Sequence, residues 1–259
     1  MGTIVLVIIV NFLVETCAGM TGVAGFLLPM FYAGFLNMDP VEGLALSFAA
    51  FMVAGVLGCP AYRKTGDLPF RPCIALLAGS AIGAAAGTGI GLVLPPKVLS
   101  VILYLVVLAS GISVLVRMRA DRDRLAQGPA AVAKASRFPS KPALFVIGVL
   151  TAVICAASGA GGPILVIPIL MLLGVGARKA VAMAILDSVV IAIPATIGYF
   201  AGGDLSPQVW MMLPGAVIAS SAGMVVGSMN AHRINARLLK TIVAVGAIGI
   251  SAVKLLGIA

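Results

Sequence analysis

Most of this chain consists of runs without a charged residue, and these runs restrict its fold more than any other feature does. Short segments that hold nearly all of the charge separate them. The uncharged runs lie at residues 1–14, 16–38, 43–62, 72–96, 98–116, 142–177, 180–203 (interrupted by Asp187), 205–232 and 241–253. Because about 20 apolar residues in a helix cross roughly 30 Å of hydrocarbon, the runs predict an all-α polytopic membrane protein.

Composition excludes the main soluble classes. Of the 259 residues, 61% are hydrophobic and 10% are charged, whereas a soluble domain has about 25% charged residues. The net charge of +9 would suit a nucleic-acid partner only if the bases formed a patch on a soluble face, and here they are confined to the connecting segments. We therefore expect the lipid bilayer as a partner and no nucleic acid. Four cysteines without a CxxC pair and a single histidine indicate no metal and no cofactor.

Two apolar segments have lengths that fit neither one crossing nor two. Residues 2–36 and 142–175 would each form a helix of about 50 Å, and each contains a glycine-rich break, at 19–25 and at 158–163. Broken helices at membrane depth persist where they line a cavity or lie inside protein. Each segment is therefore interpreted as a re-entrant hairpin of two half-length helices.

An internal duplication relates the two halves of the chain. The glycines at 79, 87 and 91 recur 136 residues later, and the motif that starts at Cys17 recurs at Cys155. Each half is therefore predicted to be a broken hairpin followed by three spans. The N-terminal repeat (1–116) has its hairpin at 2–36 and spans at 41–62, 72–94 and 98–117, and the C-terminal repeat (142–259) has its hairpin at 142–175 and spans at 179–201, 206–230 and 235–256.

The positions of the basic residues predict how the repeats are oriented. With both long segments as hairpins, 15 Lys and Arg residues lie on one side and only Lys97 and Lys254 on the other, whereas a plain crossing at 142–177 would give 11 and 6. Cytoplasmic loops collect Lys and Arg, so the first arrangement is preferred. It makes the halves inverted-topology repeats in a bacterial inner membrane, with the basic linker 117–141 cytoplasmic and both termini periplasmic.

Inverted repeats with discontinuous helices are typical of secondary transporters, whose substrates bind near the membrane midplane at the breaks. A helix that begins at Gly25 or Pro163 presents backbone N–H groups without an intrahelical acceptor, and no Lys or Arg lies in the middle of a span. We therefore expect amides and nearby hydroxyls to bind a small anion; alternatively, the glycines serve only as hinges or packing sites. The candidate substrate-binding residues are Thr21, Gly22, Val23, Ala24, Gly25, Phe26, Ser47, Ser158, Gly161, Gly162, Pro163 and Ser188.

Glu15 and Asp187 are the only acids inside apolar segments. Because a buried acid is costly in a membrane, each is either a site of proton coupling or a carboxyl that is hydrogen-bonded to a neighbouring helix. Cys17 and Cys155 take matching positions before the breaks and are either adjacent to the ligand or small packing residues.

Several other residues are assigned roles in packing or anchoring. Ser47 and Ser188 are taken as equivalent positions of the two halves, where packing competes with ligand binding. The glycines of 79–91 and 215–227 are interpreted as close helix–helix contacts. Trp210 and Tyr199 are expected to anchor at the outer membrane interface.

The glycine-rich motifs end in Phe26-Leu27-Leu28-Pro29 and in Ile164-Leu165-Val166-Ile167-Pro168. With the duplicated halves and the basic central linker, they resemble the TauE/SafE sulfite exporter family over essentially the whole chain. The resemblance implies a transporter, not an enzyme, that exports sulfite or a C2 organosulfonate such as sulfoacetate. The first motif departs from the family in having Val23-Ala24 where further glycines are common.

Two other classes are alternatives. An anion channel could use the same glycine breaks. An intramembrane protease would need Ser158 with His232, or Asp187 with Asp204, but Ser158 lacks the GxSx pattern and Asp204 falls in an outer turn. The sequence leaves a homo-oligomeric assembly open.

Overall fold

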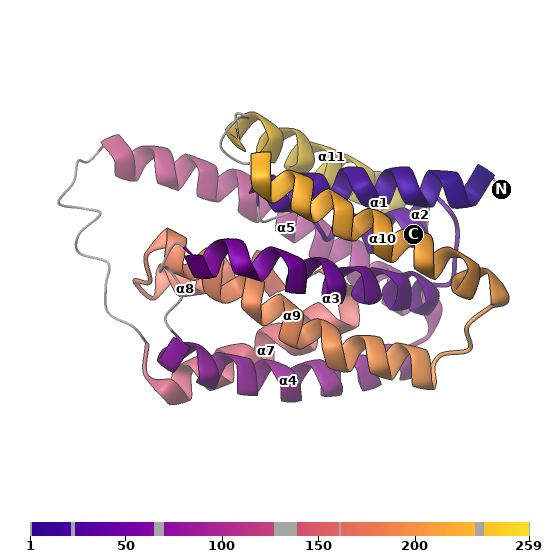
Figure 1. Cartoon of the computed structure of the whole chain (residues 1–259), viewed down its shortest axis with the longest axis horizontal. Helices are drawn as coiled ribbons and strands as arrows, with labels where there is room; N and C mark the ends of the chain where they lie inside the picture. Colours follow the sequence, from indigo (N-terminus) through magenta and orange to yellow (C-terminus); the bar gives the residue numbers. More distant parts are fainter. Residues whose placement is uncertain are drawn as a thin grey trace.

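The computed structural model describes residues 2–21, 24–64, 70–126, 139–160, 162–230 and 236–258. Over these ranges the regular secondary structure is entirely helical (Figure 1). The helices are α1 (Gly2–Thr21), α2 (Leu27–Gly34), α3 (Pro40–Lys64), α4 (Phe70–Val93), α5 (Pro96–Ala126), α7 (Lys141–Ser158), α8 (Gly162–Leu172), α9 (Ala177–Gly202), α10 (Pro207–Asn230) and α11 (Ala236–Ile258). In the described part of the chain, seven helices are long and apolar enough to cross a bilayer, which confirms the all-α polytopic prediction.

The two hairpins have unequal arms, so the expectation of half-length helices is wrong. The first arms, α1 and α7, contain 20 and 18 residues, and the second arms, α2 and α8, contain 8 and 11. At 1.5 Å per residue, the first arms are about 27–30 Å long, enough to cross the hydrocarbon. The physical reason lies in where the glycines stand: each break follows a full-length apolar run and leaves only a short run after it.

Helix α5 continues past the predicted end of its span. It contains 31 residues, about 46 Å of helix, and includes the charged segment 117–126 that was assigned to the linker. Arg, Leu and Ala are good helix formers, so the helix does not stop where the apolar run stops. The boundary between span and linker is therefore a change of polarity within one helix.

The glycine ladders let helices of opposite halves approach closely, as predicted. α4 lies along α7, and α1 lies along α10 (Figure 1). A Cβ atom on five of these glycines would collide with a backbone carbonyl oxygen of the partner helix. The colliding pairs are Gly79 with Phe145, Gly83 with Val149 and Gly87 with Val153 between α4 and α7, and Gly223 with Phe12 and Gly227 with Thr16 between α10 and α1.

Packing partners correspond between the halves. The first arm of each hairpin packs on the second of the three later helices of the other half, while α3 packs on α9 and α5 packs on α11. The two halves are therefore interleaved. The inverted relation between them and the exact repeat boundaries stay predictions.

Chain ends and connections divide between the two ends of the molecule. In Figure 1 both termini and the α9–α10 connection lie toward the right, whereas the end of α5 and the start of α7 lie toward the left. At the end of the molecule where the two termini lie, the Glu42 carboxylate accepts a hydrogen bond from the Ser206 N–H at 2.7 Å. This bond joins the first turn of α3 to the α9–α10 turn and so links the two halves.

Candidate functional site

The two hairpin breaks lie against one another. Gly159, which ends α7 with a left-handed φ of 69°, packs under α2 and α3: a Cβ atom there would lie 2.6 Å from Pro29 Cγ and 2.5 Å from Leu44 Cδ2. Phe26, at the start of α2, and Ile164, in the first turn of α8, belong to one buried cluster. The residues that begin both short arms are therefore brought together.

Helix α2 begins through a turn at residues 24–27. The Leu27 N–H donates to the Ala24 carbonyl oxygen at 3.1 Å, and the Leu28 N–H donates to the Gly25 carbonyl oxygen at 3.0 Å. Helix geometry leaves the amides of Gly25 and Phe26 without an acceptor inside α2. The helix N-terminus expected at Gly25 thus lies two residues further on, and the amides around it remain suited to an anion.

Part of the predicted site falls at the limits of what is described. Ala24 and Phe26 are buried, and Gly25 is half-buried. Thr21 is the last residue of α1, and Gly162 and Pro163 are the first residues of α8. Gly22, Val23 and Gly161 lie outside the described residues.

All three candidate serines donate their hydroxyl hydrogens to their own helices. Ser47 Oγ donates to the Gly43 carbonyl at 2.7 Å, Ser158 Oγ to the Ile154 carbonyl at 2.6 Å, and Ser188 Oγ to the Ile185 carbonyl at 2.7 Å. An anion needs donors, so these hydroxyls would have to rotate before they could bind one.

Ser47 and Ser188 lie at different distances from the starts of their helices. Ser47 lies seven residues after the start of α3, whereas Ser188 lies eleven residues after the start of α9. The difference is about one helical turn. The equivalence of the two serines stays a prediction, and it requires that α3 and α9 begin about one turn apart in the two halves.

Both acids in the apolar segments are deeply buried. Glu15 is 1% exposed and Asp187 is 0% exposed. Among the residues that the structure describes, no hydrogen bond of standard geometry reaches either oxygen of Asp187 or Oε1 of Glu15. The Ser80 hydroxyl of α4 lies beside the Asp187 carboxyl, but Ser80 Oγ makes no hydrogen bond of standard geometry. Ser80 is thus the neighbouring-helix residue placed to hold the Asp187 carboxyl, and both interpretations of Asp187, proton coupling and a carboxyl held by a neighbouring helix, stay predictions.

A polar network at Asn11 was not anticipated from the sequence. Asn11 Nδ2 donates to Tyr32 Oη at 2.7 Å and to the Val7 carbonyl at 2.8 Å, while Ser220 Oγ donates to Asn11 Oδ1 at 3.0 Å. The network ties α1 to α2 and to α10. The signal that could have predicted this network is the asparagine itself, because Asn11 is the single asparagine in the apolar run that forms α1.

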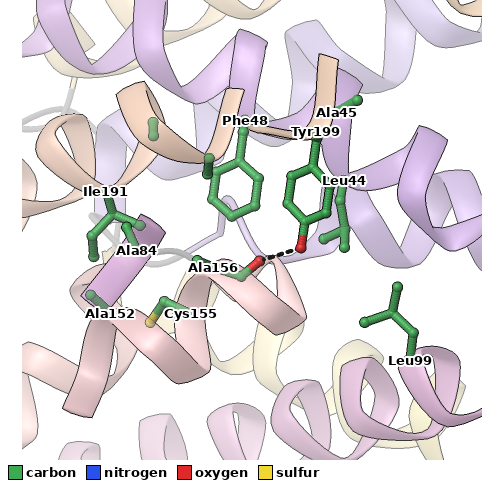
Figure 2. Close-up of a cluster of buried hydrophobic side chains, with 12 residues drawn as sticks. Leu44, Ala45, Phe48, Ala84, Leu99, Ala152, Cys155, Ala156, Ile191 and Tyr199 are labelled. Atoms are coloured by element: carbon green, nitrogen blue, oxygen red, sulfur yellow. Dashed lines mark hydrogen bonds between the residues drawn. The ribbon is translucent and has the colours of Figure 1, made fainter. Parts of the chain in front are cut away.

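Tyr199 is a buried residue and not the interfacial anchor that was expected. Its side chain is 0% exposed, its ring stacks on Phe48 with centroids 6.0 Å apart, and its hydroxyl donates to the Ala156 carbonyl at 2.9 Å (Figure 2). The phenol is drawn inward because the end of α7 offers a buried acceptor. Trp210, by contrast, is 55% exposed, as an interfacial anchor requires.

The cysteines differ in their surroundings. Cys155 is buried in the hydrophobic cluster that contains Tyr199 and Phe48 (Figure 2), which favours packing over ligand contact. Cys17 is half-buried. Cys17, Cys73 and Cys155 carry thiols rather than disulfides.

The geometry weighs against a protease. Asp187 and Asp204 stand on and just beyond α9, with at least about 22 Å of helix between them, so they cannot share a proton as an aspartyl pair does. Ser158 donates its hydroxyl hydrogen to Ile154, and its proposed partner His232 lies outside the described residues.

Comparison with known proteins gives one family. The chain matches the family model described as "Sulfite exporter TauE/SafE" over residues 7–255. None of the curated proteins and none of the solved structures matches it. The resemblance seen in the glycine-rich motifs is thus confirmed across nearly the whole chain.

Proposed function

The chain belongs to the sulfite exporter TauE/SafE family, a family of membrane transporters, and from this we propose that it exports a small sulfur-containing anion across the bacterial inner membrane. The anion is sulfite or a C2 organosulfonate such as sulfoacetate. Both termini are periplasmic in this proposal, and the linker 117–141 is cytoplasmic.

The observation that supports a binding site is the meeting of the two hairpin breaks. The contact of Gly159 with Pro29 brings together two short helices that start in glycine-rich segments. Helix N-termini attract anions through backbone N–H groups and the helix dipole. In the proposed site, amides of 24–26 and 161–163 bind the sulfonate or sulfite oxygens without a cationic side chain, and this moderate binding permits release.

The membrane potential supplies a driving force for export. An inside-negative potential favours the exit of one negative charge by about 2.3 kcal/mol per 100 mV, so a coupling ion is not required. A proton-coupled cycle is the variant that the buried acids support. A charged carboxylate buried without a partner is strongly unfavourable, and uptake of a proton by Asp187 as the anion binds would remove that charge.

Efflux from proteoliposomes tests the proposal. Vesicles loaded separately with sulfite, sulfoacetate, taurine or sulfate should release the first two fastest, with saturation and with counterflow. Saturation and counterflow distinguish a carrier from the alternative, an anion channel. Sulfite and sulfoacetate efflux equal to that of protein-free vesicles would contradict the proposed function.

A pair of glycine variants tests the site. In Gly25→Ala, the added methyl group would lie 3.2 Å from the Phe51 ring and would stand in the path of an anion that approaches the amides. We expect a higher KM for the anion. Gly89→Ala is the matched control, because a Cβ atom there meets nothing within 4 Å. Equal KM values in the two variants would contradict the assignment of this site.

A further inference from the structure

Three observations converge on the Tyr199 hydroxyl. It donates to the Ala156 carbonyl in the last turn of α7. The ring is fixed by stacking on Phe48, with an interplanar angle of 10°. Gly91 of α4 leaves the space that the hydroxyl fills, since a Cβ atom on Gly91 would collide with Tyr199 Oη and lie 3.2 Å from Tyr199 Cζ.

The Ala156 carbonyl needs a hydrogen-bond donor from outside its own helix. The last four carbonyls of a helix lack intrahelical donors. In α7 the Gly159 N–H donates a hydrogen bond to the Cys155 carbonyl at 2.8 Å. The Tyr199 hydroxyl donates to the next carbonyl, that of Ala156. Tyr199 is thus the side chain that ties the end of α7 to α9.

The tied turn leads directly into the contact between the hairpins. Gly159, three residues after Ala156, is the residue that packs against Pro29 and Leu44. A shift of the last turn of α7 would therefore move the α7–α8 break relative to α2. Figure 2 shows the Tyr199 hydroxyl reaching the Ala156 carbonyl from within the cluster that also holds Cys155.

We infer that Tyr199 is a positioning residue for the anion site, and that Gly91 is glycine in order to admit its hydroxyl. Tyr199 does not touch the anion. It holds the end of α7, and through Gly159 it sets the separation of the two hairpin breaks. This inference rests on the proposed function for its transport readout, but not for its structural readout.

The structural readout is alkylation of Cys155, whose buried thiol directly precedes Ala156. The other three cysteines are replaced by alanine, and labelling with N-ethylmaleimide is followed in substrate-free membranes. Tyr199→Phe keeps the stacked ring and removes the hydroxyl, so it should speed labelling about three- to tenfold, the range that one lost hydrogen bond produces. The Gly89→Ala control should label at the unsubstituted rate.

A double-substitution cycle tests the link to Gly91. Gly91→Ala alone should speed labelling, because the methyl group displaces the hydroxyl. In the Tyr199→Phe background it should add little, because the methyl group then enters vacated space. Equal effects of Gly91→Ala in both backgrounds, or unchanged labelling in Tyr199→Phe, would overturn the inference. If Tyr199→Phe does not fold, the labelling of Gly91→Ala against Gly89→Ala decides the question in the same way.

Transport measurements separate positioning from general stability. Tyr199→Phe should raise the KM for sulfite or sulfoacetate efflux about three- to tenfold while the maximal rate per folded molecule changes by less than about twofold. A fall in maximal rate with an unchanged KM would overturn the positioning role. If the unsubstituted protein transports neither anion, the proposed function fails, whereas the labelling cycle still tests how Tyr199 and Gly91 act on α7.

Discussion

Gly159 packs directly against Pro29, and this contact joins the turn of the second hairpin to the short helix of the first. A side chain at position 159 would not fit, because its Cβ atom would lie 2.6 Å from Pro29 Cγ. The φ of 69° at Gly159 belongs to a region that glycine adopts without steric cost. The contact thus requires both the missing side chain and the unusual backbone conformation.

Gly159→Ala should therefore destabilise the protein strongly. A non-glycine residue at positive φ and an overpacked contact each cost about 1–3 kcal/mol, so the free energy of unfolding should fall by about 2–6 kcal/mol. The thermal unfolding midpoint in detergent measures the change. Gly89→Ala, in open space, should leave the midpoint unchanged, and similar midpoints for the two variants would contradict the contact.

Asp187→Asn keeps the shape of the side chain and removes its ability to take up a proton. If Asp187 couples protons to export, the variant should lose the dependence of efflux on pH, and its maximal rate should fall by about tenfold or more. Efflux from proteoliposomes between pH 5.5 and 8 measures both. Glu15→Gln is the matched control, since it neutralises the other buried acid. An unaltered pH profile in Asp187→Asn would end the proton-coupling proposal.

Asn11→Leu should weaken the packing of the first hairpin. The change removes two bonds between helices, to Tyr32 and from Ser220, and side-chain hydrogen bonds between membrane helices are worth about 0.6 kcal/mol each on average. We expect a loss of about 1–2 kcal/mol, measured as a lower unfolding midpoint. Asn230→Leu removes only an exposed bond within α10 and should have little effect; an equal loss there would contradict a structural network at Asn11.

Single cysteines at Lys97 and Lys179 should face opposite sides of the membrane. These residues lie in the first turns of α5 and α9, and the predicted charge distribution places the first outside and the second in the cytoplasm. With the native cysteines replaced, an impermeant maleimide should label Lys97→Cys in intact spheroplasts and Lys179→Cys only after permeabilisation. Labelling of both in intact spheroplasts would contradict the inverted topology.

Local features of the fold could be predicted from the sequence because membrane helices and glycine contacts follow local rules. Apolar length indicates a span, and glycines four residues apart indicate a close contact. The partner in that contact is not a local property. Nothing in the spacing of Gly79, Gly83 and Gly87 says that they face α7 rather than another helix of their own half.

The candidate site was predicted less completely. The glycine breaks were found because their residue types are unusual at membrane depth, but the bonding of the side chains around them depends on tertiary contacts. Tyr199 seemed an interfacial tyrosine by position, and only the buried carbonyl at Ala156 explains its orientation. The serines were predicted as ligands because of their hydroxyls. In the structure each hydroxyl donates to a carbonyl of the preceding helical turn and not toward the site.

The interleaving of the halves sets the order in which this chain can mature. α1 leaves the ribosome first, yet the helix whose backbone it must touch begins only at Pro207. Until then the surface of α1 that packs on α10 faces lipid or an insertion factor, and the Asn11 side chain has Val7 and Tyr32 as partners but not Ser220. A product that stops after the first half would lack the helices on which α1, α3, α4 and α5 pack and could not complete its own interior.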